Sequence, residues 1–221
     1  MFCLGMKNGE KYMNKVILFN FNGTIVNTKN LAIDIFNQIA EKQGYKKISE
    51  EEVPLLSTLS IRDRCKTLNV PIYKMPLVGI AIKRRYQTYI PNLKPVLGIS
   101  EVLKELKKQD YKLGFLTSNN QNKIDEFLIN NTINSFDYSH FSFNPFSKSK
   151  DISSFLKNNR LKKDEVIYVG DELRDIKAAK ENGLFCIAAS WGYDSIELLS
   201  TGNADFVAKQ PKDILDILSG T

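Results

Sequence analysis

Short apolar runs alternate with amphipathic segments along most of the chain. The apolar runs are rich in Val, Ile, Leu and Phe, which is typical of strands that are buried on both faces. We predict strands at residues 16–21, 111–117, 136–143, 166–170 and 184–190, with a short sixth at 205–208. Apolar residues at three-to-four spacing predict helices at 99–109, 120–130, 151–159 and 172–182. This alternation predicts an α/β protein with a doubly wound parallel sheet, because parallel neighbours require crossover helices.

The stretch between the first two predicted strands is much longer than one crossover helix requires. Within it, segments 31–39, 60–68 and 77–90 show helical spacing of apolar residues, and prolines separate them. We therefore predict a small α-helical cap domain at 28–95, inserted into a core domain formed by 13–27 and 96–221. Residues 1–12 are expected to be an N-terminal extension. A helical domain inserted directly after a strand can close over the crevice at the end of that strand.

Composition and charge narrow the class of protein. Hydrophobic residues make up 43% of the chain and charged residues 25%, and no apolar run approaches the ~20 residues of a membrane span. The three cysteines lack any paired spacing, which predicts reduced thiols and a cytoplasmic protein. The net charge is +6, but Lys and Arg are spread along helical segments, so we expect a solvated surface and no nucleic acid partner. A basic nucleic-acid-binding module is the alternative from a different class.

Polar side chains follow the first two predicted strands, at the edge where open α/β sheets build their ligand crevices. Asn20 and Asn22 end the first strand and precede a Gly-Thr turn. Thr117, Ser118 and Asn119 end the second strand, and they offer a hydroxyl, backbone N–H groups and a helix N-terminus to an anion. The first pair could instead form a simple Asn-Gly turn, and the Thr-Ser pair could merely cap the following helix.

Charged side chains follow the third and fourth predicted strands. Lys148 would supply a point charge for a phosphate, and Lys150 is the alternative in the same segment. Asp171 and Asp175 are four residues apart across a strand-to-helix turn, where both can face one point and hold Mg²⁺ through oxygen ligands. Their alternative role is to stabilise a helix N-terminus electrostatically. Donors for phosphate oxygens and a metal are what phosphoryl transfer requires.

In this order, the four groups of residues resemble the motifs of the haloacid dehalogenase superfamily, in its phosphoglycolate-phosphatase-like branch with a helical cap. The resemblance covers residues 14–221. It implies a Rossmann-like core and the hydrolysis of small phosphorylated metabolites. It also implies that Asn20 is at the nucleophile position, that Asn22 is at the acid and base position, and that Thr117 and Lys148 are the phosphate-oriented groups. The implied Mg²⁺ ligands are the side chain at 20, the backbone carbonyl of Asn22 and Asp171, with Asp175 added from the turn argument above.

Asn20 and Asn22 depart from that family pattern, which has Asp at both positions. An amide is a very poor nucleophile, and Asn22 has no proton to give to a leaving alkoxide. We therefore expect a catalytically impaired protein with a weakened Mg²⁺ site that still binds a small phosphorylated metabolite. Three explanations stay open: a natural pseudophosphatase that binds a phosphorylated ligand or partner, a phosphatase disabled by deliberate substitution, or a surviving route through Asp171 or bound water. These residues fix neither the substrate nor the oligomeric state.

Overall fold

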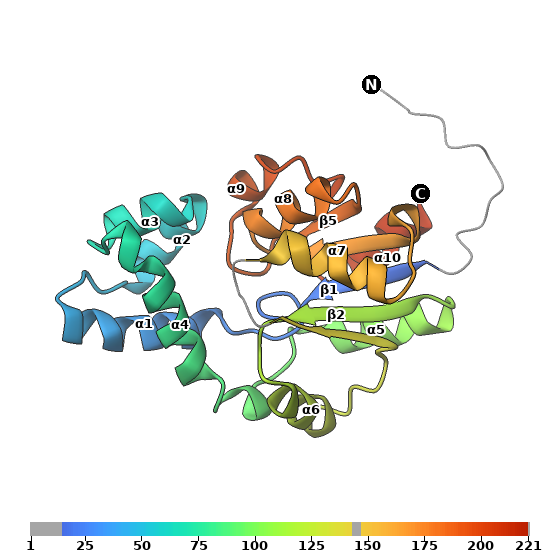
Figure 1. Cartoon of the computed structure of the whole chain (residues 1–221), viewed down its shortest axis with the longest axis horizontal. Coiled ribbons are helices and arrows are strands. Elements are labelled where there is room, and N and C mark those ends of the chain that lie inside the picture. The colour runs from blue at the N-terminus through green and yellow to red at the C-terminus, as the bar shows by residue number, and fades with distance from the viewer. Residues whose placement is uncertain (1–14, 143–146, 221) are drawn as a thin grey trace.

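The computed structural model describes residues 15–142 and 147–220, so the predicted N-terminal extension and the last residue of the predicted third strand lie outside the described residues. Within these ranges, six parallel strands form one sheet in the order β3-β2-β1-β4-β5-β6 (Figure 1). The strands are β1 (Val16–Asn20), β2 (Lys112–Thr117), β3 (Tyr138–Phe141), β4 (Val166–Gly170), β5 (Phe185–Ala189) and β6 (Phe206–Ala208). The predicted α/β class with a doubly wound parallel sheet is confirmed.

Helices cover both faces of the sheet. On one face, α5 (Ile99–Lys108), α6 (Gln121–Asn130) and α10 (Asp213–Ser219) bury apolar side chains in the core. On the other face, α7 (Lys148–Asn158), α8 (Leu173–Glu181) and α9 (Ile196–Ser200) do the same, and a short 3₁₀ helix, η4 (Lys163–Glu165), precedes β4. Each long helix presents one apolar stripe because its buried residues recur at three-to-four spacing. The α5 stripe consists of Ile99, Val102, Leu103 and Leu106.

The central strands bring the predicted site residues to one edge of the sheet. β1 lies between β2 and β4, and all five of its residues are buried, as expected for an apolar run in a parallel sheet. Asn20 lies level with Leu116 of β2, and Phe19 lies level with Val169 of β4. Because the strands run in the same direction, their carboxyl ends open onto the same edge.

Between β1 and β2 the chain forms a helical insert, in the segment predicted as a cap domain. The insert contains α1 (Lys29–Gln43), α2 (Val53–Thr58), α3 (Ile61–Thr67) and α4 (Met75–Tyr86), with 3₁₀ helices η1 (Glu50–Glu52), η2 (Ile72–Lys74) and η3 (Ile90–Asn92). It has a hydrophobic cluster of its own, which includes Phe36, Leu56, Cys65 and Leu68. Figure 1 shows the insert beyond the carboxyl ends of the strands. The domain boundaries at 28 and 95 and the role of a moving cap stay predictions.

The two chain segments that join the insert to the sheet lie side by side. Val26 forms an antiparallel bridge with Pro95, and the backbone N–H of Val96 donates to the carbonyl of Ile25 at 2.8 Å. The chain therefore enters and leaves the insert through one narrow, paired connection.

Some helices differ from the sequence prediction. The apolar pattern does not predict α2, α9 or α10, and α7 begins at Lys148 rather than at residue 151. The added turn of α7 places Lys148 at a helix start, close to the strand ends, instead of in a loop. No helix in residues 15–142 and 147–220 is long and apolar enough to cross a membrane.

Candidate active site

Polar residues from different strands meet at the carboxyl edge of the sheet. Asn20 is the last residue of β1, Thr117 is the last residue of β2, and Asp171 directly follows β4. All three are buried, because each continues a strand whose apolar side chains fill the core. Lys148 reaches this cluster from the first turn of α7, whereas Lys150 is exposed.

Asn20 is at the centre of the cluster and uses both ends of its amide. Its Nδ2 donates to the backbone carbonyl of Asn22 and to Asp171 Oδ1, each at 2.8 Å. Its Oδ1 accepts a hydrogen bond from Lys148 Nζ, also at 2.8 Å. The reverse orientation would set the amide oxygen against two acceptors and the NH₂ group against an ammonium, so the neighbours fix this one.

Asp171 is enclosed by donors and by glycines. Thr24 Oγ1 donates to Asp171 Oδ1 at 2.7 Å, and the backbone N–H of Tyr193 donates to Oδ2 at 3.0 Å. A Cβ atom at Gly23, which has φ of 82°, or at Gly192 would come within 2.1 or 2.2 Å of Oδ2, so only glycine fits at either position. Burial, followed by repulsion from the carboxylates of the next turn, raises the pKa of Asp171 to about 7.

Asp175 is buried in the same turn but faces a different point. Its Oδ2 accepts the backbone N–H groups of Asp171 and Glu172 at 3.1 and 3.2 Å. Its Oδ1 forms an ion pair with Lys148. Asp175 therefore stabilises the start of α8 and holds Lys148, which is close to the alternative role that the sequence leaves open for it.

Asn22 joins the core to the helical insert through neutral groups. Its Nδ2 donates to the hydroxyl of Tyr86 at 2.8 Å, and its Oδ1 accepts from Asn119 Nδ2 at 2.9 Å. Gln87, next to Tyr86, donates from Nε2 to Asn119 Oδ1 at 3.1 Å and accepts the backbone N–H of Asn120 at 3.0 Å. The insert therefore occupies part of the α6 N-terminus that the sequence predicts as an anion cradle.

Two adjoining cavities open among these groups. The smaller one has a volume of about 40 Å³ and the larger, between the core and the insert, about 240 Å³. The smaller cavity is lined by Asn20, Asn22, Leu116, Thr117, Ser118, Ser142, Lys148, Asp151, Glu172 and Arg174. Asn22, Ser118, Glu172 and Arg174 also line the larger cavity, together with apolar residues of α3 and α4. A small charged group in the first cavity could thus continue into a bulkier, more apolar part in the second.

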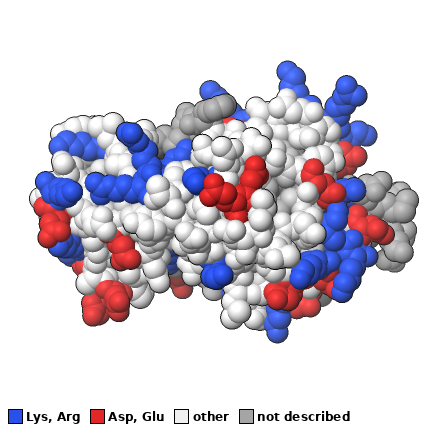
Figure 2. Space-filling view, turned by 90° about the horizontal axis from the view of Figure 1, so that it is seen from below, with Lys and Arg blue, Asp and Glu red and all other residues white. Residues whose placement is uncertain are grey.

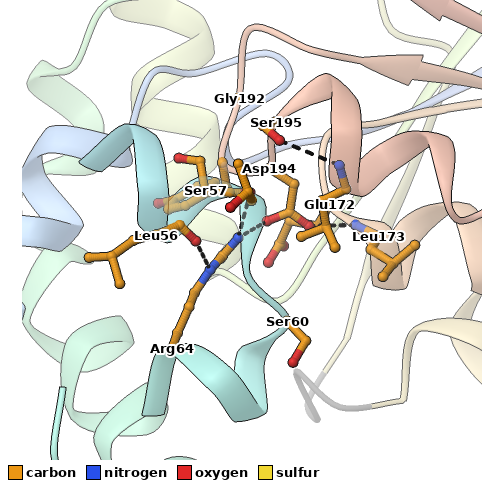
Figure 3. A network of polar contacts seen from close by, with 12 residues as sticks. Leu56, Ser57, Ser60, Arg64, Glu172, Leu173, Gly192, Asp194 and Ser195 are labelled. Atoms are coloured by element: carbon orange, nitrogen blue, oxygen red, sulfur yellow. Dashed lines mark hydrogen bonds and ion pairs between the residues drawn. The ribbon is translucent and has the colours of Figure 1, made fainter. Parts of the chain in front are cut away.

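A second polar network connects the insert to the loop after β5 (Figure 3). Arg64 of α3 forms an ion pair with Asp194, whose Oδ2 accepts the backbone N–H of Leu173 at 2.7 Å. The backbone N–H of Ser195 donates to the carbonyl of Ser57 at 3.0 Å. The insert is therefore linked, through Asp194, to the strand-to-helix turn that carries Asp171.

The sequence and the fold both match known proteins. Residues 17–189 match the family model described as haloacid dehalogenase-like hydrolase. The chain belongs to this family. The match runs from the second residue of β1 to the end of β5, and it includes the strand ends that meet at the cluster described above.

Relatives of this haloacid dehalogenase-like chain match over nearly its whole length. A phosphoglycolate phosphatase from Synechococcus elongatus is 27% identical over 206 residues, covering 93% of this chain and 97% of that protein. The pyrophosphatase PpaX from Bacillus mycoides is 23% identical, with 92% and 96% covered. The crystal structure of a predicted phosphatase from Clostridium acetobutylicum has a TM-score of 0.77 at 18% identity, with 95% and 100% covered. This last likeness shows the shared fold.

The Mg²⁺ site that resemblance to haloacid dehalogenase proteins implies would need oxygens of residues 20, 22 and 171 around one cation. Here Asn20 presents its NH₂ group, rather than an oxygen, to the other two. Both oxygens of Asp171 already accept hydrogen bonds, and Asp175 is turned to backbone N–H groups and to Lys148. In the part of the chain that the structure describes, no group of three or more His, Cys, Asp and Glu is placed to hold a metal. As arranged, these residues do not fit Mg²⁺.

Sequence reasoning missed several residues of this haloacid dehalogenase-like site. Arg174 Nη2 donates to Glu172 Oε2 at 2.6 Å, and although burial opposes the change, this guanidinium lowers the pKa of Glu172. Both residues are in the segment 170–175, where the available signal is a group of three acidic residues and one arginine directly after a strand. Tyr86 carries no such signal, because its contact with Asn22 depends on how the insert lies against the core.

Proposed function

We propose that this chain is a phosphatase scaffold of the haloacid dehalogenase type that binds a small phosphorylated metabolite and hydrolyses it at a trace rate or not at all. The observation that carries the proposal is Asn20: an amide at the end of the central strand, 2.8 Å from Lys148 Nζ. The matches to a phosphoglycolate phosphatase and a pyrophosphatase over nearly the whole chain support the scaffold.

The chemistry of the two amides supports the loss of turnover. A carboxylate can attack phosphorus and form an acyl phosphate, whereas the amide of Asn20 cannot do so usefully. Asn22 cannot protonate a leaving group or activate water, and its amide is engaged with Tyr86 and Asn119. Losing a nucleophile lowers the rate by roughly 10⁴ to 10⁶ in other covalent enzymes. A chain of this kind acts through binding, as a pseudophosphatase does.

The groups around the smaller cavity support binding of a phosphate. Lys148 and Arg174 contribute positive charge, and Thr117 and Ser118 contribute hydroxyl groups. The larger cavity would receive the rest of the metabolite. The face that Figure 2 shows does not favour the nucleic acid alternative, because Lys and Arg lie there in separate groups with Asp and Glu among them, rather than in one stripe.

The test is phosphate release, with excess Mg²⁺, from a panel of small phosphomonoesters. The chain as it is should show no turnover above trace, and Asn20→Asp combined with Asn22→Asp should create it. Asn20→Asp alone should form a phosphoenzyme from a good leaving group but hydrolyse it slowly, because water lacks a base. Ordinary enzymatic rates in the unmodified chain, with mass spectrometry confirming both amides, would refute the impaired-enzyme part of the proposal.

A further inference from the structure

We propose that the side-chain amide of Asn20 takes the place of a divalent cation in this site, so that the site binds phosphate without Mg²⁺. This inference rests on the proposed function, in which the cluster at the strand ends holds a phosphate. It goes beyond that function because it assigns the role of a cofactor to a residue of the chain.

The geometry comes first. The nitrogen of one amide lies 2.8 Å from the carbonyl oxygen of Asn22 and 2.8 Å from Asp171 Oδ1, and it has one proton for each. Electropositive hydrogens therefore hold together two oxygens that a metal ion would otherwise bridge. Asn20 is also fixed from the other side by Lys148. A cation entering between these oxygens would have to break both N–H···O bonds and turn the amide away from the ammonium.

The charge of the site leads to the same conclusion. Four carboxylates (Asp151, Asp171, Glu172 and Asp175) face two cations (Lys148 and Arg174) around the smaller cavity and its floor. With Mg²⁺ bound, carboxylates at positions 20 and 22 would both be ionised and would add two negative charges, which the ion would cancel. Two amides give the same formal charge with no ion present. An incoming phosphate therefore meets the same electrostatic repulsion as at a site that has Asp at positions 20 and 22 and holds Mg²⁺. This repulsion is smaller than at such a carboxylate site without the ion.

The decisive measurement is calorimetric titration of the full chain with inorganic phosphate, in excess EDTA and in excess MgCl₂. The Kd of the wild-type chain should change by less than about twofold between the two conditions, since a cation that does not bind contributes nothing by linkage. The Asn20→Asp, Asn22→Asp variant should bind phosphate at least about tenfold more tightly with Mg²⁺ than with EDTA. Asn134→Asp, an exposed change in the loop after α6, is the matched control and should behave like the wild type. A wild-type affinity that rises tenfold or more with Mg²⁺ would overturn the inference.

A second measurement separates this inference from the proposed function. Mn²⁺ binding is followed by electron paramagnetic resonance without phosphate. Any Mn²⁺ that the wild-type chain binds should still be bound after the Asp171→Asn substitution. The Asn20→Asp variant should bind an additional Mn²⁺ ion, and adding Asp171→Asn to that variant should abolish this binding. If the wild-type chain bound Mn²⁺ at a site that requires Asp171, the proposal that the Asn20 amide replaces a cation would be wrong, whatever the result with phosphate. A wild-type chain that binds no phosphate in either buffer would instead overturn the proposed function and, with it, metal-free phosphate binding.

Discussion

Replacing Asn20 by Asp should destabilise the protein in EDTA, and Mg²⁺ should restore much of the loss. In the present structure one amide nitrogen donates to two oxygens at 2.8 Å. The substitution turns both contacts into oxygen facing oxygen, one of them against the buried carboxylate of Asp171. Lys148 still faces the new side chain and offsets part of this repulsion.

The size of the effect follows from these contacts. The substitution removes two hydrogen bonds, each of which contributes about 1 kcal/mol net to the free energy of unfolding. The bond to the charged Asp171 contributes more than the other one. The new carboxylate at position 20 and that of Asp171 form a buried pair, which keeps one proton at neutral pH. The repulsion between them therefore lowers the free energy of unfolding by only a further ~1–2 kcal/mol. The total is about 3 kcal/mol, a little below the cost of leaving a fully unpaired buried charge. For a chain of this length, that lowers the Tm by roughly 6–12 °C.

The assay is thermal and urea unfolding at neutral pH, in EDTA and in excess MgCl₂. Wild type should have the same midpoint in both buffers, whereas Asn20→Asp should be destabilised in EDTA and move back toward wild type with Mg²⁺. Asn134→Asp, which places the same charge change in the exposed loop after α6, should stay within about 0.5 kcal/mol of wild type. An Asn20→Asp protein as stable as wild type in EDTA would refute the reasoning, because the two hydrogen bonds donated by the Asn20 amide would then contribute nothing to the free energy of unfolding.

Three further predictions follow from the same cluster. The pKa of Asp171 is raised to about 7, chiefly by burial, so the folded state binds more protons than the unfolded state between about pH 4 and pH 7. The free energy of unfolding that this group contributes therefore falls as the pH rises through that window. Urea unfolding should therefore show wild type losing more stability than Asp171→Asn between pH 5 and pH 8, and equal slopes would count against a raised pKa. Lys148→Ala should weaken inorganic phosphate binding by about tenfold or more, while Lys150→Ala should leave it nearly unchanged; equal effects would remove Lys148 from the site. If the insert moves as a lid, hydrogen exchange at 26–28 and 91–95 should be faster than in the sheet and should slow on ligand binding, and exchange as slow as in β1 under both conditions would rule out such motion.

Most of the fold could be predicted because its strands are nearly pure apolar runs. β4 begins and ends where the pattern predicts, and β1 differs by one residue. α9 could not be predicted because it has five residues, too few for a period to stand out, and Leu199 is buried only by tertiary packing. α10 was missed although its buried Ile214 and Leu218 are four residues apart, which is the spacing of one helical turn. The start of α7 at Lys148 was missed because its first turn carries no apolar residue.

The candidate site could be predicted only as far as topology determines it. Asn20, Thr117 and Asp171 had to lie close together once their strands were parallel neighbours. The direction of each side chain depends on partners that no strand pattern reveals. Asp175 turns to the backbone of its own helix start, and Asn22 turns to Tyr86 of the insert. The direction of each of these side chains depends on several acceptors that compete for a few donors. This competition arises only once the site is assembled.

The ion pair between Arg64 and Asp194 also bears on the order in which the chain can fold. Its two residues are 130 positions apart, whereas the hydrophobic cluster of the insert draws only on residues between Phe36 and Ile82. During synthesis from the N-terminus, the insert can therefore pack its own helices early. It cannot take its final orientation until Asp194 has emerged, and Asp194 also donates its backbone N–H to the carbonyl of Asp171. The loop after β5, which is made late in synthesis, thus sets both the orientation of the insert and the turn beneath the candidate site.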